Sequence, residues 1–154
     1  MNRLVLKFGG TSVGTIDKIK KVARIVKNKI IEGNEIIVVV SAMSGVTNDL
    51  AEKSNLISKN FDKQELDTLL ASGEQASCSL LSGALIDLGL KSRSWLGWQI
   101  PILTNTNHTS SQIIKIRTEE VSNFISDKGI AVLAGFQGVS SENRITTLGR
   151  GGSD

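Results

Sequence analysis

Three short apolar runs, each followed by a loop of small residues, are the feature that most constrains the fold of this chain. The runs span residues 4–8, 36–40 and 130–134. They lack the alternation of polar and apolar residues that a half-exposed strand shows, so they are typical of buried parallel strands. The small-residue loops that follow them are GGTSVG at 9–14, SAMSGVTN at 41–48 and GFQG at 135–138.

Helical patterns separate the apolar runs. A helix is predicted from about Thr15, with Gly33 placed to cap its end. Asp62 and Glu65 have the spacing of a capping box for a second helix, which Gly73 interrupts before an apolar series resumes at 76–88. We expect that glycine to serve a close backbone approach or a break. A third helix with an acidic first turn is predicted over 118–129. The face expected to be buried in the first helix carries Ile16, Ile19, Val22, Ala23, Val26 and Ile30.

This order of elements predicts an α/β fold with a parallel sheet covered on both faces. In such sheets ligands bind beyond the carboxyl ends of the strands. The three small-residue loops all fall at those ends. We therefore expect them to form one site.

Composition indicates one soluble globular domain, because 40% of the 154 residues are hydrophobic, 21% are charged and only one is proline. The net charge is +3, but the 18 basic residues are interleaved with 15 acidic ones. The densest basic run, 18–29, has the spacing of a solvated helix face, so a nucleic-acid partner is not expected. The apolar segments are too short for a secretory signal or a membrane span, which predicts a cytoplasmic protein.

The single cysteine and the single histidine exclude an internal disulfide and a cysteine-rich or histidine-rich metal site. Cys78 lies in an apolar stretch and is interpreted as a small core residue. His108 is interpreted as a polar loop residue in preference to a catalytic base. Trp95 and Trp98 are interpreted as packing residues.

Lys7 is the residue in the first loop region with the clearest chemical implication. A lysine in the last turn of a buried strand is costly unless an anion meets it. Gly9 and Gly10 leave backbone N–H groups open, and the start of the next helix adds its positive dipole end, so the group predicts a phosphate site. The alternative is a lysine that extends past the strand end into water. A Walker loop does not fit, because Thr15 and Ile16 stand where Lys and Ser or Thr are required.

Several polar residues could complete a site of this kind. Glu74 and Asp154 are candidate acidic partners, and Arg150 is a candidate fork for a carboxylate or phosphate. Ser41, Thr47 and Ser153 could donate hydroxyl hydrogen bonds. For Glu74 the alternative is an exposed acid at a helix start.

Five motifs together resemble aspartate kinase, a branch of the amino-acid-kinase superfamily. They are KFGGTSV at 7–13, SAMSGVTN at 41–48, SGE at 72–74, GFQG at 135–138 and TTLGRGGSD at 146–154. The resemblance implies a three-layer α/β/α sandwich with a mainly parallel sheet. It also implies transfer of the γ-phosphoryl group of ATP, with Mg²⁺, to the side-chain carboxylate of L-aspartate. That step opens lysine, threonine and methionine biosynthesis.

The resemblance also assigns roles to individual residues. Lys7 would neutralise the phosphoryl oxygens, and Glu74 would meet the amino group of aspartate. Arg150 would bind the carboxylate of aspartate, and Asp154 would hold Lys7 or its neighbours in place. The residues implied in cofactor binding are Lys7, Phe8, Gly9, Gly10, Thr11, Ser12 and Ser41. Those implied in substrate binding are Ser41, Thr47, Glu74, Arg150, Gly151, Gly152, Ser153 and Asp154.

Members of the resembled family continue well past the motif at 146–154. We therefore expect residues 1–154 to be the amino-terminal portion of a catalytic domain, with the adenine-binding part and regulatory ACT domains absent. The full-length form is expected to be a homo-oligomer, and the isolated 154 residues to have weak or no activity. Two alternatives stay open: a non-catalytic fragment that binds aspartate or phosphate, and an amino-acid kinase with a different acceptor.

Overall fold

The structure is a computed structural model that describes residues 2–149 and residue 152. Its main sheet has four parallel strands in the order β1-β2-β6-β3. These strands are β1 (Arg3–Phe8), β2 (Glu35–Val40), β6 (Ile130–Ala134) and β3 (Ser92–Trp95). Phe8 is paired with Val40, and Val40 with Ala134, so β1, β2 and β6 end at the same level. The loops that follow these strands therefore leave the sheet side by side.

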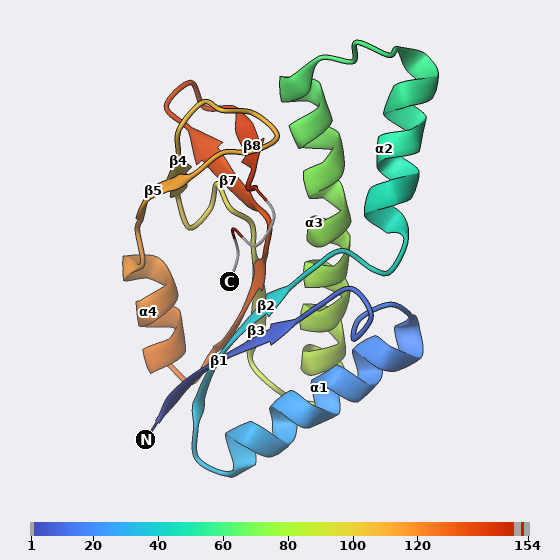
Figure 1. Cartoon of the computed structure of the whole chain (residues 1–154). Coiled ribbons are helices and arrows are strands. Elements are labelled where there is room, and N and C mark those ends of the chain that lie inside the picture. Colours follow the sequence, from blue (N-terminus) through green and yellow to red (C-terminus); the bar gives the residue numbers. More distant parts are fainter. Residues whose placement is uncertain (1, 150–151, 153–154) are drawn as a thin grey trace.

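Helices cover this sheet on both faces and make three layers (Figure 1). On one face α1 (Ile16–Ile31) and α3 (Lys63–Asp87) pack against the strands and against each other. On the other face α4 (Glu119–Ser126) contacts β6 and β2. The remaining helix, α2 (Val46–Ile57), packs on α3 and has only Ser54 buried. The predicted α/β architecture is confirmed.

The core follows the alternation of side chains along the central strands. In β2, Ile36, Val38 and Val40 face α1 and α3, while Ile37 packs on the opposite side in the cluster around α4. In β6, Ile130 and Val132 take the first side and Ala131 the second. Both strands are apolar on both faces because both faces are covered.

The first predicted helix agrees closely with α1. Thr15 is its N-cap and accepts a hydrogen bond from the Lys18 amide, and Gly33 follows the helix with a φ of 88°. The chain turns there in the left-handed region, which glycine adopts without steric cost. Of the predicted apolar face, Ile19, Val22, Ala23 and Val26 are buried and Ile30 is partly buried. The prediction was wrong for Ile16, which is 50% exposed at the first turn.

The expectation that residues 4–8 form a strand buried on both faces was wrong. β1 is the edge strand, and its side chains alternate between exposed and half-buried. Leu4, Leu6 and Phe8 pack toward the core, whereas Val5 is 64% exposed and Lys7 is exposed. The run is apolar on both sides, but in the described part of the chain α4 covers β2 and β6 and leaves the outer face of β1 uncovered.

Gly73 allows a close approach and does not break the helix. α3 runs without interruption through it, and Asp62 caps the start by accepting hydrogen bonds from the Gln64 and Glu65 amides. A Cβ at Gly73 would lie 2.9 Å from the Cβ of Ala42. The glycine therefore lets the loop after β2 pack directly on α3.

A second, smaller sheet extends the first and was not predicted. Its strands run in the order β5-β4-β7-β8, and β7 follows β6 after only two residues. The predicted loop at 135–138 is therefore shorter than expected, because Gln137 already belongs to β7. The strands are β4 (Ile102–Thr104), β5 (Ile113–Ile116), β7 (Gln137–Ser140) and β8 (Ile145–Thr147).

The two tryptophans differ in burial. Trp95 is buried and makes an edge contact with Phe124 at a centroid distance of 5.8 Å, as expected of a packing residue. Trp98 is 50% exposed, so about half of this side chain lies outside the core. The predicted helix at 118–129 is confirmed as α4. Among the described residues, no helix combines the length and apolarity needed to cross a bilayer.

Candidate active site

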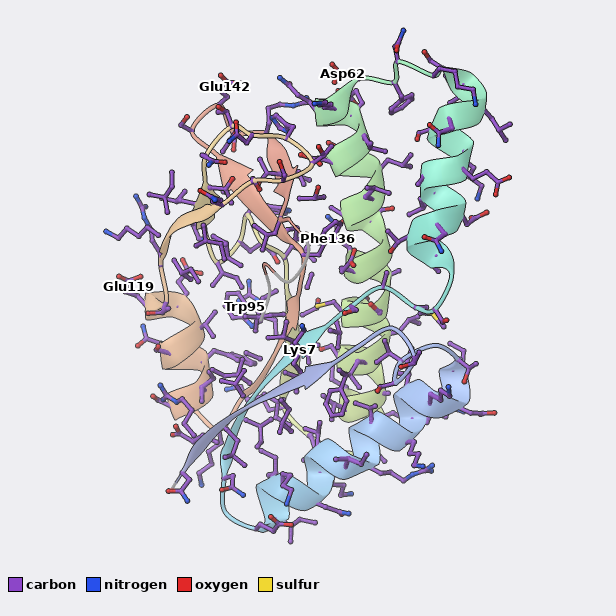
Figure 2. The ribbon with its side chains drawn as sticks, viewed as in Figure 1. Lys7, Asp62, Trp95, Glu119, Phe136 and Glu142 are labelled. Atoms are coloured by element: carbon purple, nitrogen blue, oxygen red, sulfur yellow. The ribbon has the colours of Figure 1, made fainter. Side chains whose placement is uncertain are left out.

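The loops at the carboxyl ends of β1, β2 and β6 surround one cavity of about 520 Å³. Lys7, Gly10 and Thr11 line it from β1 and its loop, and residues 41–45 and 47 line it from the segment after β2. Glu74 of α3 lines its base, and Phe136, Gly149 and Gly152 line the side next to the small sheet. Lys7 and Phe136 both lie near the middle of the molecule, beside α3 (Figure 2). The three loops therefore line one cavity, as predicted.

Ala42 is the point at which three backbone segments meet. A Cβ at Gly10 would lie 2.9 Å from the carbonyl oxygen of Ala42, and the Cβ of Ala42 itself lies against Gly73. Contacts this close are available only to glycine. The glycine loop therefore packs directly on the backbone of the loop after β2, and only the methyl group of Ala42 lies between that loop and Gly73 of α3.

Glu74 is the buried acidic group of the cavity. Only 4% of the residue is exposed, and its Oε1 accepts a hydrogen bond from the Ala42 amide at 3.1 Å. Its Oε2 is buried and has no hydrogen-bond partner among the described residues. Burial raises the pKa of this carboxyl to about 7, and the bond from Ala42 offsets part of the effect. The alternative of an exposed acid at a helix start is wrong, since Glu74 lies in the middle of α3.

The segment after β2 is anchored to α3 and then starts a helix at the cavity. The Ser77 hydroxyl donates to the carbonyl oxygen of Ser41 at 2.6 Å. Gly45 is the N-cap of α2, has a φ of 85° and provides no side-chain cap, and Thr47 follows in the first turn. Uncapped N–H groups at a helix start attract anions. The helix start at the cavity thus belongs to α2, whereas the sequence had indicated α1.

Lys7 lines the cavity from the end of the edge strand. The argument that its charge is buried within a strand was wrong, because the residue is exposed. Its position beside Gly10 and Thr11 still brings a positive charge to the glycine loop. Lys18 supports that loop from α1 by donating from Nζ to the Thr11 carbonyl oxygen at 2.9 Å.

The cavity contains part of the predicted site. Of the residues predicted for cofactor or substrate binding, Lys7, Gly10, Thr11, Ser41, Thr47, Glu74 and Gly152 line it. Phe8, Gly9 and Ser12 do not: Phe8 packs against the core, and the Gly9 carbonyl accepts a hydrogen bond from the Ser12 amide within the loop. Arg150, Gly151, Ser153 and Asp154 lie outside the described residues.

Phe136 is the main cavity residue that the sequence did not single out. It has a φ of 66°, in the left-handed region that an aromatic residue seldom adopts. Such strain is retained where the surroundings fix the backbone, commonly beside functional sites. Gly135, which precedes Phe136, was the one sign of a turn in this part of the sequence. It did not indicate that Phe136 would be the residue with a positive φ.

Cys78 and His108 lie away from the cavity lining. Cys78 is fully buried in α3, and burial raises the pKa of its thiol to about 12, so the expectation of a core residue is confirmed. His108 belongs to a loop, as expected, but its side chain is only 7% exposed and contacts Asp67. The described residues contain no group of three or more His, Cys, Asp or Glu side chains that could hold a metal ion.

Comparison with known proteins identifies the family. The profile of the Amino acid kinase family matches residues 2–154. The chain belongs to the amino acid kinase family. The three-layer fold of this chain is therefore the fold of the amino acid kinase family, as the resemblance implied.

Curated relatives of this amino acid kinase chain are aspartokinases. The aspartokinase of Rickettsia conorii is 48% identical over 157 residues, and that of Geobacillus stearothermophilus is 44% identical over 154 residues. Both matches cover all of this chain but only 39% and 38% of the relative. The chain thus spans less than half the length of the curated relatives it matches.

Solved structures agree with the fold. The aspartate kinase from Synechocystis is 39% identical with a TM-score of 0.81, and the match covers 99% of this chain and 25% of that one. Escherichia coli aspartokinase III, solved in complex with aspartate and ADP, has a TM-score of 0.80 at 21% identity over 99% of this chain and 44% of its own. At that identity the likeness shows the fold alone.

Proposed function

We propose that the full-length protein carrying this chain is an aspartate kinase. It transfers the γ-phosphoryl group of ATP to the side-chain carboxylate of L-aspartate and releases ADP and 4-phospho-L-aspartate. The observation that carries the proposal is that one cavity joins Lys7 to the buried, half-partnered carboxylate of Glu74. The family and the names of the curated relatives support the same reaction.

Glu74 is suited to bind the amino group of the acceptor. Its Oε2 has no hydrogen-bond partner in the described part of the protein, and an ammonium group supplies both donors and a compensating charge. A buried carboxylate that lacks a partner is unfavourable, so binding the ammonium removes an existing cost. Glu74 would therefore orient the amino acid with its side-chain carboxylate toward Lys7.

Other residues that line the cavity are suited to phosphate. Lys7, the glycine loop at Gly10 and Thr11, and the start of α2 at Gly45 present positive charge and backbone N–H groups. Mg²⁺ binds such sites together with the nucleotide, and phosphate oxygens and water provide many of its ligands. When bound it would neutralise phosphate charge.

The reaction requires positioning and charge neutralisation more than proton transfer. The acceptor carboxylate is already an anion, so it attacks the γ-phosphorus without a general base while the bond to the ADP oxygen breaks. Two anions must approach each other, and Lys7 would offset their repulsion. A histidine or cysteine is not needed for this step.

Residues outside the described part of the chain complete the proposal. From the resemblance, Arg150 would bind the α-carboxylate of aspartate, and Asp154 would hold Lys7 or its neighbours in place. Gly149 and Gly152, on either side of Arg150, line the cavity.

The test is an assay of the full-length protein in which hydroxylamine traps the acyl phosphate formed from ATP and L-aspartate. We expect Lys7→Ala to abolish turnover without loss of the fold. Lys29→Ala is the matched control, because Lys29 lies in the last turn of α1 and pairs with Glu32. If the wild type turned over a different amino acid in place of aspartate in an acceptor screen, the assignment of aspartate as the substrate would be wrong. Unchanged turnover of Lys7→Ala would remove Lys7 from the mechanism.

A further inference from the structure

Asp67 is a fully buried carboxylate that does not line the cavity. It lies on α3 seven residues before Glu74, about two helical turns away and on the same side of the helix. Its Oδ1 accepts from the Thr147 hydroxyl at 2.5 Å and the Thr109 amide at 3.0 Å. Its Oδ2 lies 2.7 Å from Nδ1 of His108. A buried carboxylate is tolerated only with such partners, so this cluster is a built feature of the fold.

His108 and Thr109 join the loop between β4 and β5 to this carboxylate. Nδ1 of His108 lies within hydrogen-bond distance of Oδ2 of Asp67. Thr109 has a φ of 70°, and its amide reaches both oxygens of Asp67. The loop is thereby fixed on α3.

Thr147 connects the cluster to the wall of the cavity. It is the last residue of β8, and Leu148 follows it with an amide that donates to the carbonyl oxygen of Phe136 at 2.8 Å. The next residue, Gly149, lines the cavity. The Thr147 carbonyl oxygen also accepts from the amide and the hydroxyl of Ser111. A shift of Thr147 would therefore move Phe136 and Gly149 together.

Helix α3 holds both walls of the cavity. Toward one wall, Glu74 and Ser77 bind the backbone of Ala42 and Ser41. Toward the other, the carbonyl oxygen of Ala71 accepts from the Gln137 side chain at 3.1 Å. Asp67 supplies the corresponding contact to β8, where the small sheet meets the cavity.

We propose that Asp67 is a positioning residue that sets the affinity for the amino-acid substrate by holding Thr147. The proposal rests on the proposed function, since it concerns the same cavity. Asp67 does not touch the substrate. It fixes the wall that contains Phe136, Gly149 and Gly152 relative to Glu74, which binds the amino group of the acceptor.

The nucleotide site should respond less than the acceptor site. Gly10 and Thr11 are held by contacts with Ala42 and Lys18, which do not involve Asp67 or β8. A displaced wall at Gly149 would therefore raise the KM for aspartate more than the KM for ATP. A variant that only weakened the fold would change the KM for aspartate and the KM for ATP alike.

The experiment uses steady-state kinetics of the full-length protein with Thr147→Val and Thr147→Ser as a matched pair. Valine keeps the shape and removes the hydroxyl, and serine keeps the hydroxyl. We expect Thr147→Val to raise the KM for aspartate about tenfold, an upper value set by the free energy of the one hydrogen bond that is lost. The KM for ATP and kcat should change less than about twofold, and Thr147→Ser should stay near the wild type.

A double-mutant cycle then tests whether Asp67 acts through Thr147. Adding Thr147→Val to Asp67→Ala should raise the KM for aspartate no further than Asp67→Ala alone, because the contact is already lost. Additive effects, or a folded Thr147→Val protein with the wild-type KM, would overturn the proposal. If Asp67→Ala does not fold, the Thr147 pair decides. A wild type inactive on aspartate refutes the proposed function instead, and the same comparison is then made with the acceptor that the screen identifies.

Discussion

The Ala42 amide donates a hydrogen bond to Oε1 of Glu74 at 3.1 Å, and this contact joins the loop after β2 to the middle of α3. It satisfies one oxygen of a carboxylate that is otherwise shielded from water. The second oxygen, Oε2, is buried without a partner in the described part of the chain.

The affinity for aspartate should depend on pH through Glu74. Burial raises the pKa of its carboxyl to about 7, and only the ionised form binds an ammonium group well. The KM for aspartate should therefore rise about tenfold for each pH unit below that value. Initial rates measured from about pH 5.5 to about pH 8.5 give the KM at each pH. Glu74→Gln should raise the KM and remove its pH dependence; a titration that persists in Glu74→Gln belongs to another group.

The stability of the protein without substrate should also depend on Glu74. Its carboxyl titrates near 4.5 ordinarily and at about 7 in the folded protein, so the folded state binds more protons between these values. The free energy of unfolding should fall as pH rises through this window and level off above it, by about 3 kcal/mol in total. Urea unfolding at several pH values measures the change. Glu74→Gln keeps the acceptor for Ala42 and should lose this slope; an equal slope in both proteins would contradict the assignment.

Gly10 and Gly9 should respond differently to alanine. A Cβ at Gly10 would lie 2.9 Å from the Ala42 carbonyl oxygen, which is backbone and cannot rotate away, whereas a Cβ at Gly9 would meet no atom within 4 Å. Gly10→Ala should destabilise the protein by about 1–3 kcal/mol, the usual cost of overpacking. Gly9→Ala should change the free energy of unfolding by less than about 1 kcal/mol. Its melting temperature in a thermal scan should therefore lie within a few degrees of the wild type. Equal melting temperatures for the two variants would show that the loops are not in contact.

The thiol of Cys78 should be inert in the folded protein. It is fully buried, its Sγ lies 3.0 Å from the Val132 carbonyl oxygen, and its pKa is raised to about 12 by burial. The thiolate is the reactive form, so a disulfide reagent should not react near neutral pH until the protein unfolds. Residues 1–154 contain one cysteine, so on a protein of these residues the absorbance change of the reagent reports Cys78 directly. Rapid labelling of the native protein would show that α3 opens from the sheet.

The elements with a strong period or a continuous apolar run could be predicted from the sequence. β2, β6 and α1 agree with expectation because burial on both faces, or on one helical face, selects their residues directly. β1 was misjudged because its composition is that of a covered strand although its outer face is exposed. The strands of the small sheet have three or four residues. β4, β7 and β8 contain Thr, Ser, Gly and Gln at buried positions and β5 is exposed throughout, so they gave no periodic signal.

The site could be predicted in part. Lys7, Ser41, Thr47 and Glu74 were placed together on the basis of motifs, and all four line the cavity. The burial of Glu74 was missed because the helix around it contains Ser, Gly and Gln, which do not indicate a core position. The cluster of Asp67 with His108 and Thr147 could not be read from one sequence, since its members lie 41 and 80 residues from Asp67.

The attachment of both cavity walls to α3 makes the register of this helix a constraint in its own right. Ten residues separate Asp67 from Ser77, which a helix converts into about 15 Å along its axis. Deleting or inserting one residue between them would rotate one set of anchors by about 100° relative to the other. This segment should therefore tolerate many changes of side chain but no change of length.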